Sequence, residues 1–75
     1  MNAGKIVAIA GPVVDVEFRD CALPKIREAL TVEVRGHTYV MEVAQHIGDG
    51  TVRCIMLAQS EYLARGMKVV ATGFG

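Results

Sequence analysis

Apolar residues recur at every second position in much of this chain, which is the period of a strand with one buried face. Residues 14–18, for example, read Val-Asp-Val-Glu-Phe. Helical periodicity never persists beyond one turn. The segment at 51–57 is mostly apolar on both faces, which is typical of a strand that is covered on both sides. We therefore expect strands at residues 5–10, 14–18, 30–35, 39–43, 51–57 and 67–71.

Turn residues separate these segments. The pairs Gly11-Pro12 and Gly36-His37 and the triplet at 48–50, Gly-Asp-Gly, lie between successive strands, where glycine adopts the positive φ of a tight hairpin. Short helical turns are expected at residues 24–29, behind Pro24, and after Ser60 as a cap. Six short strands in one small chain would leave long unpaired edges unless the sheet closes. The predicted fold is all-β: a small, closed, six-stranded antiparallel barrel with one or two short helical turns, forming a single domain over residues 1–75.

Composition limits the possible functions. The chain has 75 residues, is 52% hydrophobic, and carries eight basic and eight acidic residues in scattered positions. This composition argues against disorder and against a basic surface for nucleic acid. No apolar run approaches the length of about 18 residues that a membrane-spanning helix needs, and no signal peptide is visible. Cys21 and Cys54 suit a reducing compartment better than a disulfide scaffold, so we expect an intracellular protein.

The chain offers no convincing site for chemistry. Residues 48–51, Gly-Asp-Gly-Thr, lack the spacing of a phosphate-binding loop and are interpreted as a hairpin turn. The potential metal ligands Cys21, His37, His46 and Cys54 lack the close spacing of a structural zinc site. Ser60 has no evident base beside it, and Asp15 and Glu17 are interpreted as solvated acids on a polar strand face. We therefore predict no catalytic, cofactor-binding or metal-binding residues in the chain.

Outward-facing apolar residues are the one unusual feature. If Val52, Cys54 and Met56 fill the barrel, Ile55 and Leu57 must point outward, and the first strand is apolar on both faces in the same way. Clustered exposed apolar residues mark a surface for a partner. The alternative is that a barrel end, or the loop from residue 23 to residue 30, covers them. The candidate interface residues are Ile6, Ala8, Ile55 and Leu57.

Several segments together resemble the N-terminal domain of the F-type ATP synthase beta subunit. They span most of the chain and are GPVVDVEF at 11–18, LPKI at 23–26, EVAQHIGDGTVRCI at 42–55, RGM at 65–67 and TG at 72–73. The sister alpha subunit has a similar barrel, but the first two segments look like beta. Residues 57–62 depart from the usual pattern of that family, which affects only a surface loop.

The resemblance implies a crown domain, in which alpha and beta barrels alternate in a ring. The full-length subunit would produce ATP from ADP using a transmembrane proton gradient. ATP, ADP and Mg²⁺ would bind only in a downstream nucleotide domain that these residues do not include, so this chain would have no catalysis of its own. Its partners would be ATP synthase alpha subunits directly and other ATP synthase subunits indirectly, with no nucleic acid and no direct membrane insertion. The expected location is the cytoplasmic side of the bacterial inner membrane, peripheral and through the complex.

Two other functions stay open from the residues alone. One is a free-standing barrel that binds nucleic acid or a regulatory protein, which the balanced charge and scarce aromatic residues disfavour. The other is a small enzyme, which the lack of a nucleophile, metal or phosphate site disfavours.

Overall fold

The structure is a computed structural model that describes residues 2–58 and 61–75. Its described residues form strands and turns and contain no helix. The strands are β1 (Ala3–Ala10), β2 (Val13–Glu17), β3 (Ala29–Val34), β4 (His37–Gly48), β5 (Thr51–Met56) and β6 (Lys68–Ala71).

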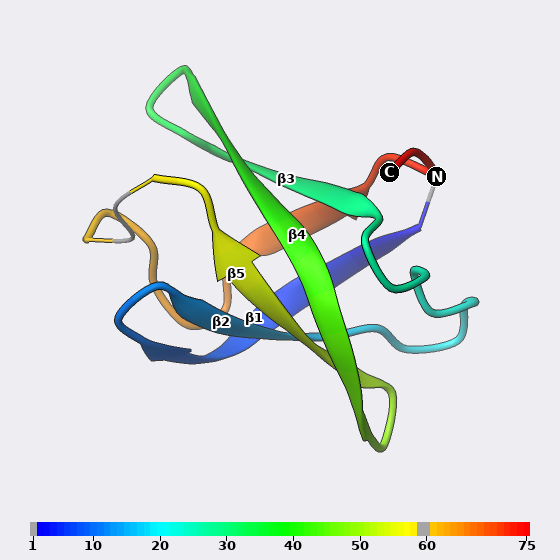
Figure 1. Ribbon diagram of the computed structural model, residues 1–75. Helices are drawn as coiled ribbons and strands as arrows, with labels where there is room; N and C mark the ends of the chain where they lie inside the picture. Colours follow the sequence, from blue (N-terminus) through cyan, green and yellow to red (C-terminus); the bar gives the residue numbers. More distant parts are fainter. Residues whose placement is uncertain (1, 59–60) are drawn as a thin grey trace.

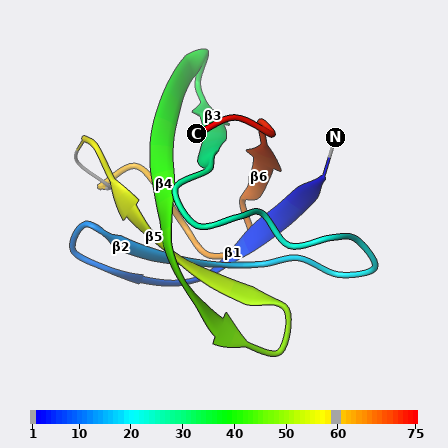
Figure 2. The same cartoon turned by 45° about the vertical axis from the view of Figure 1, so that its right-hand side comes forward.

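The strands close into an antiparallel barrel with the order β1-β2-β5-β4-β3-β6. Closure occurs at β6, which pairs with β1 on one side and with β3 on the other. Figure 1 shows the long β4 crossing the barrel with a hairpin at each of its ends, and Figure 2 shows β6 lying between β3 and β1. The predicted closed six-stranded barrel is confirmed, because every strand has a hydrogen-bonded neighbour on both sides.

Three hairpins have two-residue turns, and their backbone conformations explain the turn residues. The turns are Gly11-Pro12, Arg35-Gly36 and Asp49-Gly50, each between the paired ends of two strands. The last two have positive φ at both turn residues, which is the conformation of the type I′ turns that match the twist of a hairpin. Residues 48–51 therefore form a hairpin, as predicted, and not a phosphate-binding loop.

The core fills the inside of the barrel with side chains from all six strands. Val14, Leu30, Met41, Val52 and Val69 are fully buried, one from each of β2 to β6, and Ile6 of β1 is also in the core. Phe18 and Leu63 extend this cluster from the loops. Alternation from β2 to β6 thus places apolar side chains inward, as the sequence pattern predicted, while the outward positions are mostly polar, with Val13, Val40 and Ile55 among the exceptions.

A β-bulge interrupts the alternation in β1. The step from Ile6 to Ala8 on β1 is matched by a single step, from Val16 to Asp15, on β2, so Val7 is the extra residue. Ile6 consequently points into the barrel while Ala8 is exposed. The expectation that Ile6 and Ala8 share an outward face is wrong, because the bulge places them on opposite faces.

The predicted helical turn at residues 24–29 is also wrong. The Glu28 N–H donates to the Lys25 carbonyl oxygen at 2.9 Å, and Arg27 has a φ of 75°, which is incompatible with a right-handed helix. The segment is an isolated turn at one end of the barrel. The second predicted turn depends on Ser60, which lies outside the described residues.

Gly50 gives a test of this hairpin geometry. Its φ is 75° and an added Cβ would lie 2.8 Å from the Phe18 carbonyl oxygen, whereas an added Cβ at Gly36, with a φ of 81°, meets nothing within 4 Å. Gly36→Ala should cost about 1–2 kcal/mol of unfolding free energy from the left-handed backbone alone. Gly50→Ala should cost at least about 1 kcal/mol more, because the backbone at Gly50 or Phe18 must also move to relieve the contact with the Phe18 carbonyl oxygen. Urea unfolding measures both variants, and equal losses would contradict this account.

Candidate functional site

An exposed cluster of apolar side chains lies across three neighbouring strands, with Glu42 of β4 as the direct cross-strand neighbour of Ile55. Val13 of β2 is the direct cross-strand neighbour of Ile55 of β5, and the Leu57 N–H donates to the Val40 carbonyl oxygen of β4 at 3.3 Å. Val40, Ile55 and Leu57 are 37%, 39% and 72% exposed, and Val13 is partly exposed. We call Val13, Val40, Ile55 and Leu57 the β2–β5–β4 face. Exposed apolar side chains gathered in this way are typical of a contact surface.

Three of the four residues predicted for the interface lie on the outside of the barrel. Ile55 and Leu57 belong to the β2–β5–β4 face, and Ala8 is exposed on β1, the next strand beyond β2. Two strand spacings separate β1 from β5, which amounts to about 10 Å. Ile6 is only 1% exposed and has no surface to offer a partner. Sequence reasoning missed Val13 and Val40. Each precedes a buried residue, Val14 or Met41, so the alternation of the strand could have predicted that both point outward.

The loop before β3 does not cover this face. Leu23 packs against the core, and Pro24 is fully buried. The Arg27 N–H donates to the Val43 carbonyl oxygen at 2.7 Å, which attaches the loop to a different part of β4. The alternative explanation for Ile55 and Leu57, that residues 23–30 fold over them, is therefore wrong.

A paired charge borders the apolar face. Asp15 of β2 and Arg53 of β5 are direct cross-strand neighbours, and the guanidinium donates to both carboxylate oxygens, Nε to Oδ1 at 2.9 Å and Nη2 to Oδ2 at 3.0 Å. The hydrogen bond to Asp15, followed by its negative charge, raises the pKa of Arg53. Asp15 is only 8% exposed, so its interpretation as a solvated acid is wrong. A two-bond pair of this kind orients both side chains and leaves no unpaired buried charge beside the apolar face.

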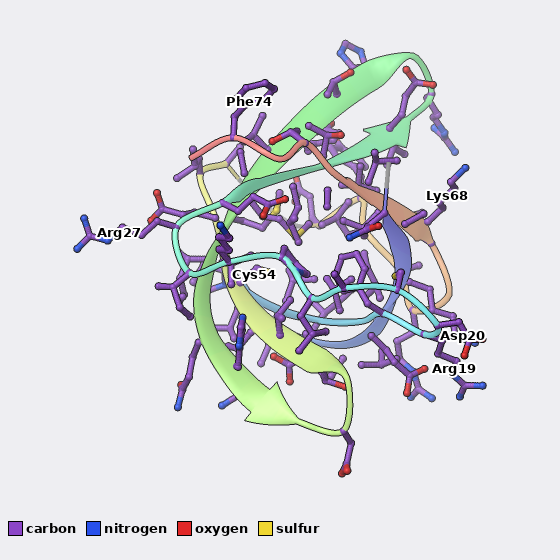
Figure 3. The ribbon with its side chains drawn as sticks, turned by 90° about the vertical axis from the view of Figure 1, so that its right-hand side faces the viewer. Arg19, Asp20, Arg27, Cys54, Lys68 and Phe74 are labelled. Atoms are coloured by element: carbon purple, nitrogen blue, oxygen red, sulfur yellow. The ribbon has the colours of Figure 1, made fainter. Side chains whose placement is uncertain are left out.

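The potential metal ligands are not gathered by the fold. Cys54 is buried inside the barrel (Figure 3). Cys21 is exposed in a loop. His46 Nε2 lies 2.7 Å from the Pro24 carbonyl oxygen, and His37 is exposed at the start of β4. Within residues 2–58 and 61–75, no group of three or more His, Cys, Asp or Glu side chains is arranged to hold a metal ion.

Comparison with known families identifies the barrel. The family model described as "ATP synthase alpha/beta family, beta-barrel domain" matches residues 6–73. The chain belongs to this family. The match spans all of β2 to β6 and most of β1, so the closed barrel described above is this family's β-barrel domain. The expected relation to ATP synthase subunits is confirmed at the level of the alpha/beta family.

Membrane-crossing helices are not a feature of this barrel domain as far as it is described. Within residues 2–58 and 61–75, no helix has the length and apolar character needed to cross a bilayer.

The two thiols of this ATP synthase family barrel should differ sharply in reactivity. Burial, followed by the charge of Asp15, raises the pKa of Cys54 from 9.0 to about 12, so its reactive thiolate is suppressed. A disulfide reagent at pH 8 should label Cys21 rapidly in the folded protein and Cys54 only after unfolding. Mass spectrometry of the labelled peptides measures this, and equal labelling rates in the folded protein would contradict it.

The same thiol predicts a loss of stability at alkaline pH. The Cys54 pKa is higher in the folded than in the unfolded state, so the unfolded state loses its proton first as the pH rises. The free energy of unfolding should therefore fall between pH 9 and pH 12. Cys54→Ala, which removes the ionisable group, should abolish this component of the pH dependence in urea unfolding.

Proposed function

We propose that this barrel is an assembly domain of an ATP synthase subunit, and that it docks sideways against the barrel of a neighbouring subunit. The observation that carries the proposal is the β2–β5–β4 face, where Ile55 and Leu57 stand exposed beside Val13 and Val40. Membership of the ATP synthase alpha/beta family indicates what the partner is, because this family includes two related types of subunit, each with such a barrel. The barrel of one type can then dock against the barrel of the other.

A closed barrel is mechanically suited to holding neighbouring subunits together. Closure of the sheet gives each strand in the described residues a hydrogen-bonded neighbour on both sides, so strand hydrogen bonds are made within the domain and the domain is stiff. A chain of 75 residues buries only about 60% of the surface that its unfolded form exposes, which leaves modest stability. A partner that covers the apolar face adds to this stability by mass action. Assembly and folding stability are therefore linked in this proposal.

Within the family we assign the chain to the beta type, as the N-terminal crown domain of a larger subunit. The support is the resemblance of residues 11–18 and 23–26 to beta subunits. The partners are then alpha subunits, alternating with beta in a ring, with the other ATP synthase subunits reached indirectly. The complex lies on the cytoplasmic side of a bacterial inner membrane. This domain is associated with that membrane peripherally, through the complex.

Catalysis belongs elsewhere in this proposal. The full subunit makes ATP from ADP with the energy of a proton gradient, and ATP, ADP and Mg²⁺ bind in a downstream nucleotide domain. The barrel contributes no reacting group and holds neighbouring subunits together while other domains change shape.

Replacing Ile55 by lysine should weaken this assembly. A central apolar contact contributes about 2 kcal/mol or more to an interface, and each 1.4 kcal/mol or so changes Kd tenfold. Ile55→Lys should therefore raise the Kd for the alpha subunit by about tenfold or more, measured by analytical ultracentrifugation. Far-ultraviolet circular dichroism and urea unfolding verify that the variant is folded.

Ile47→Lys is the matched control. Ile47 is 38% exposed, almost the same as Ile55 at 39%, but it is a bulge residue near the β4–β5 hairpin and outside the β2–β5–β4 face. This variant should leave the Kd unchanged. Equal Kd values for the wild type and both variants would contradict docking through this face. If the wild type does not bind the alpha subunit at all, or instead shows salt-dependent binding to an oligonucleotide, the assembly function itself fails.

A further inference from the structure

The C-terminal segment is fastened to the barrel by its own hydrogen bonds. Beyond the end of β6, the Thr72 N–H donates to the Ala29 carbonyl oxygen at 3.1 Å, and the Ala29 N–H donates to the Phe74 carbonyl oxygen at 2.7 Å. The Thr72 hydroxyl also donates to the Ala29 carbonyl oxygen at 2.8 Å, and it accepts from the Phe74 N–H at 3.1 Å. These contacts carry the β3–β6 pairing beyond the strand ends as far as Phe74.

Glu28 joins this segment to the turn before β3. The Gly73 N–H donates to Glu28 Oε2 at 2.9 Å, and the Lys25 N–H donates to Oε1 of the same carboxylate at 3.0 Å. One side chain thus connects two segments that are 45 residues apart in the sequence. Hydrogen bonds to a charged acceptor are about twice as strong as those between neutral groups.

The backbone of Glu28 has partners as well. Its N–H donates to the Lys25 carbonyl oxygen at 2.9 Å, and its carbonyl oxygen accepts from the Val43 N–H of β4 at 3.0 Å. All four polar atoms of Glu28 are therefore in hydrogen bonds. Arg27 beside it is held at a φ of 75°, a strained conformation for a residue with a side chain, which persists only where surrounding contacts impose it.

We propose that Glu28 is a clasp that fixes the position of the C-terminal segment on the barrel. The segment forms part of a surface groove of about 660 Å³, with Thr31 and Val70 among its other lining residues and Thr72 and Phe74 contributed by the segment. Phe74 is 76% exposed and points away from the barrel (Figure 3). The clasp therefore holds one wall of the groove, and a large exposed aromatic side chain, in a defined place. It also sets the direction of the chain at residues 72–75.

Amide hydrogen exchange on the 75-residue chain tests the clasp. Glu28→Gln removes the charge and leaves one accepting oxygen, so only one of the Gly73 and Lys25 N–H groups can keep an acceptor, and that hydrogen bond is no longer strengthened by charge. Exchange of the Gly73 and Ala29 amides should become about tenfold faster or more, because the segment lifts from β3. Amides of Val52 and Cys54 in the core should keep their protection, which shows that the barrel is intact.

Two variants separate this clasp from simpler explanations. Glu33→Gln removes the same charge from an exposed position on β3 and should leave the Gly73 amide unchanged. Thr72→Val removes the neighbouring hydroxyl but leaves Glu28 in place, so it should accelerate Gly73 exchange less than Glu28→Gln does. Equal acceleration by Thr72→Val and Glu28→Gln would overturn the proposal. So would unprotected exchange of the Gly73 amide in the wild-type chain, a measurement that needs no variant.

Discussion

The pairing of β6 with both β1 and β3 is the constraint on which the rest of the structure depends. β6 is the shortest strand, Lys68–Ala71, yet it joins the two ends of the sheet. Without it the barrel would open along β1 and β3, and Val69 would leave the core, where it is fully buried. Closure also gives the sheet an inner and an outer surface, so the side chains of each strand that do not point into the core must lie on the outside of the barrel. The exposed apolar residues and the clasp at Glu28 are both consequences of that arrangement.

The two notable surfaces of this family member share only β4, which contributes Val40 to the apolar face and Thr38 to the groove. The β2–β5–β4 face is apolar and is bordered by the Asp15–Arg53 pair, whereas the groove is formed around β3 and β6 and is lined partly by polar side chains. A stiff closed sheet holds these surfaces in a constant relation to each other, since moving one would require breaking strand pairing. Lateral assembly through the first surface and a fixed C-terminal segment beside the second are compatible with a domain that acts as an anchor.

Much of the architecture was predictable because it depends on residues that are close together in the chain. Alternation placed the strands, and glycine at positive φ marked their turns. The outward direction of Ile55 and Leu57 followed from the burial of Cys54 and Met56, which alternate with them along the chain. The first strand was different, since Ile6, Val7, Ala8 and Ile9 are all apolar and either face was equally acceptable. The segment at residues 24–29 begins with Pro24, as many helices do, but Arg27 at positive φ makes it an isolated turn.

The sequence by itself determined the strands, the three hairpins and the family, because each of these rests on neighbours in the chain or on recognisable segments. It also predicted the closed barrel, because six short strands in an open sheet would leave unpaired edges. Only the tertiary structure decided that Val7 is a bulge, that Asp15 pairs with Arg53, and that Glu28 holds Gly73. Those features depend on the register between strands and on contacts between segments far apart in the chain. The length of a turn fixes the register of a hairpin, but it does not fix a bulge or the pairing of strands that no hairpin connects, such as β2 with β5.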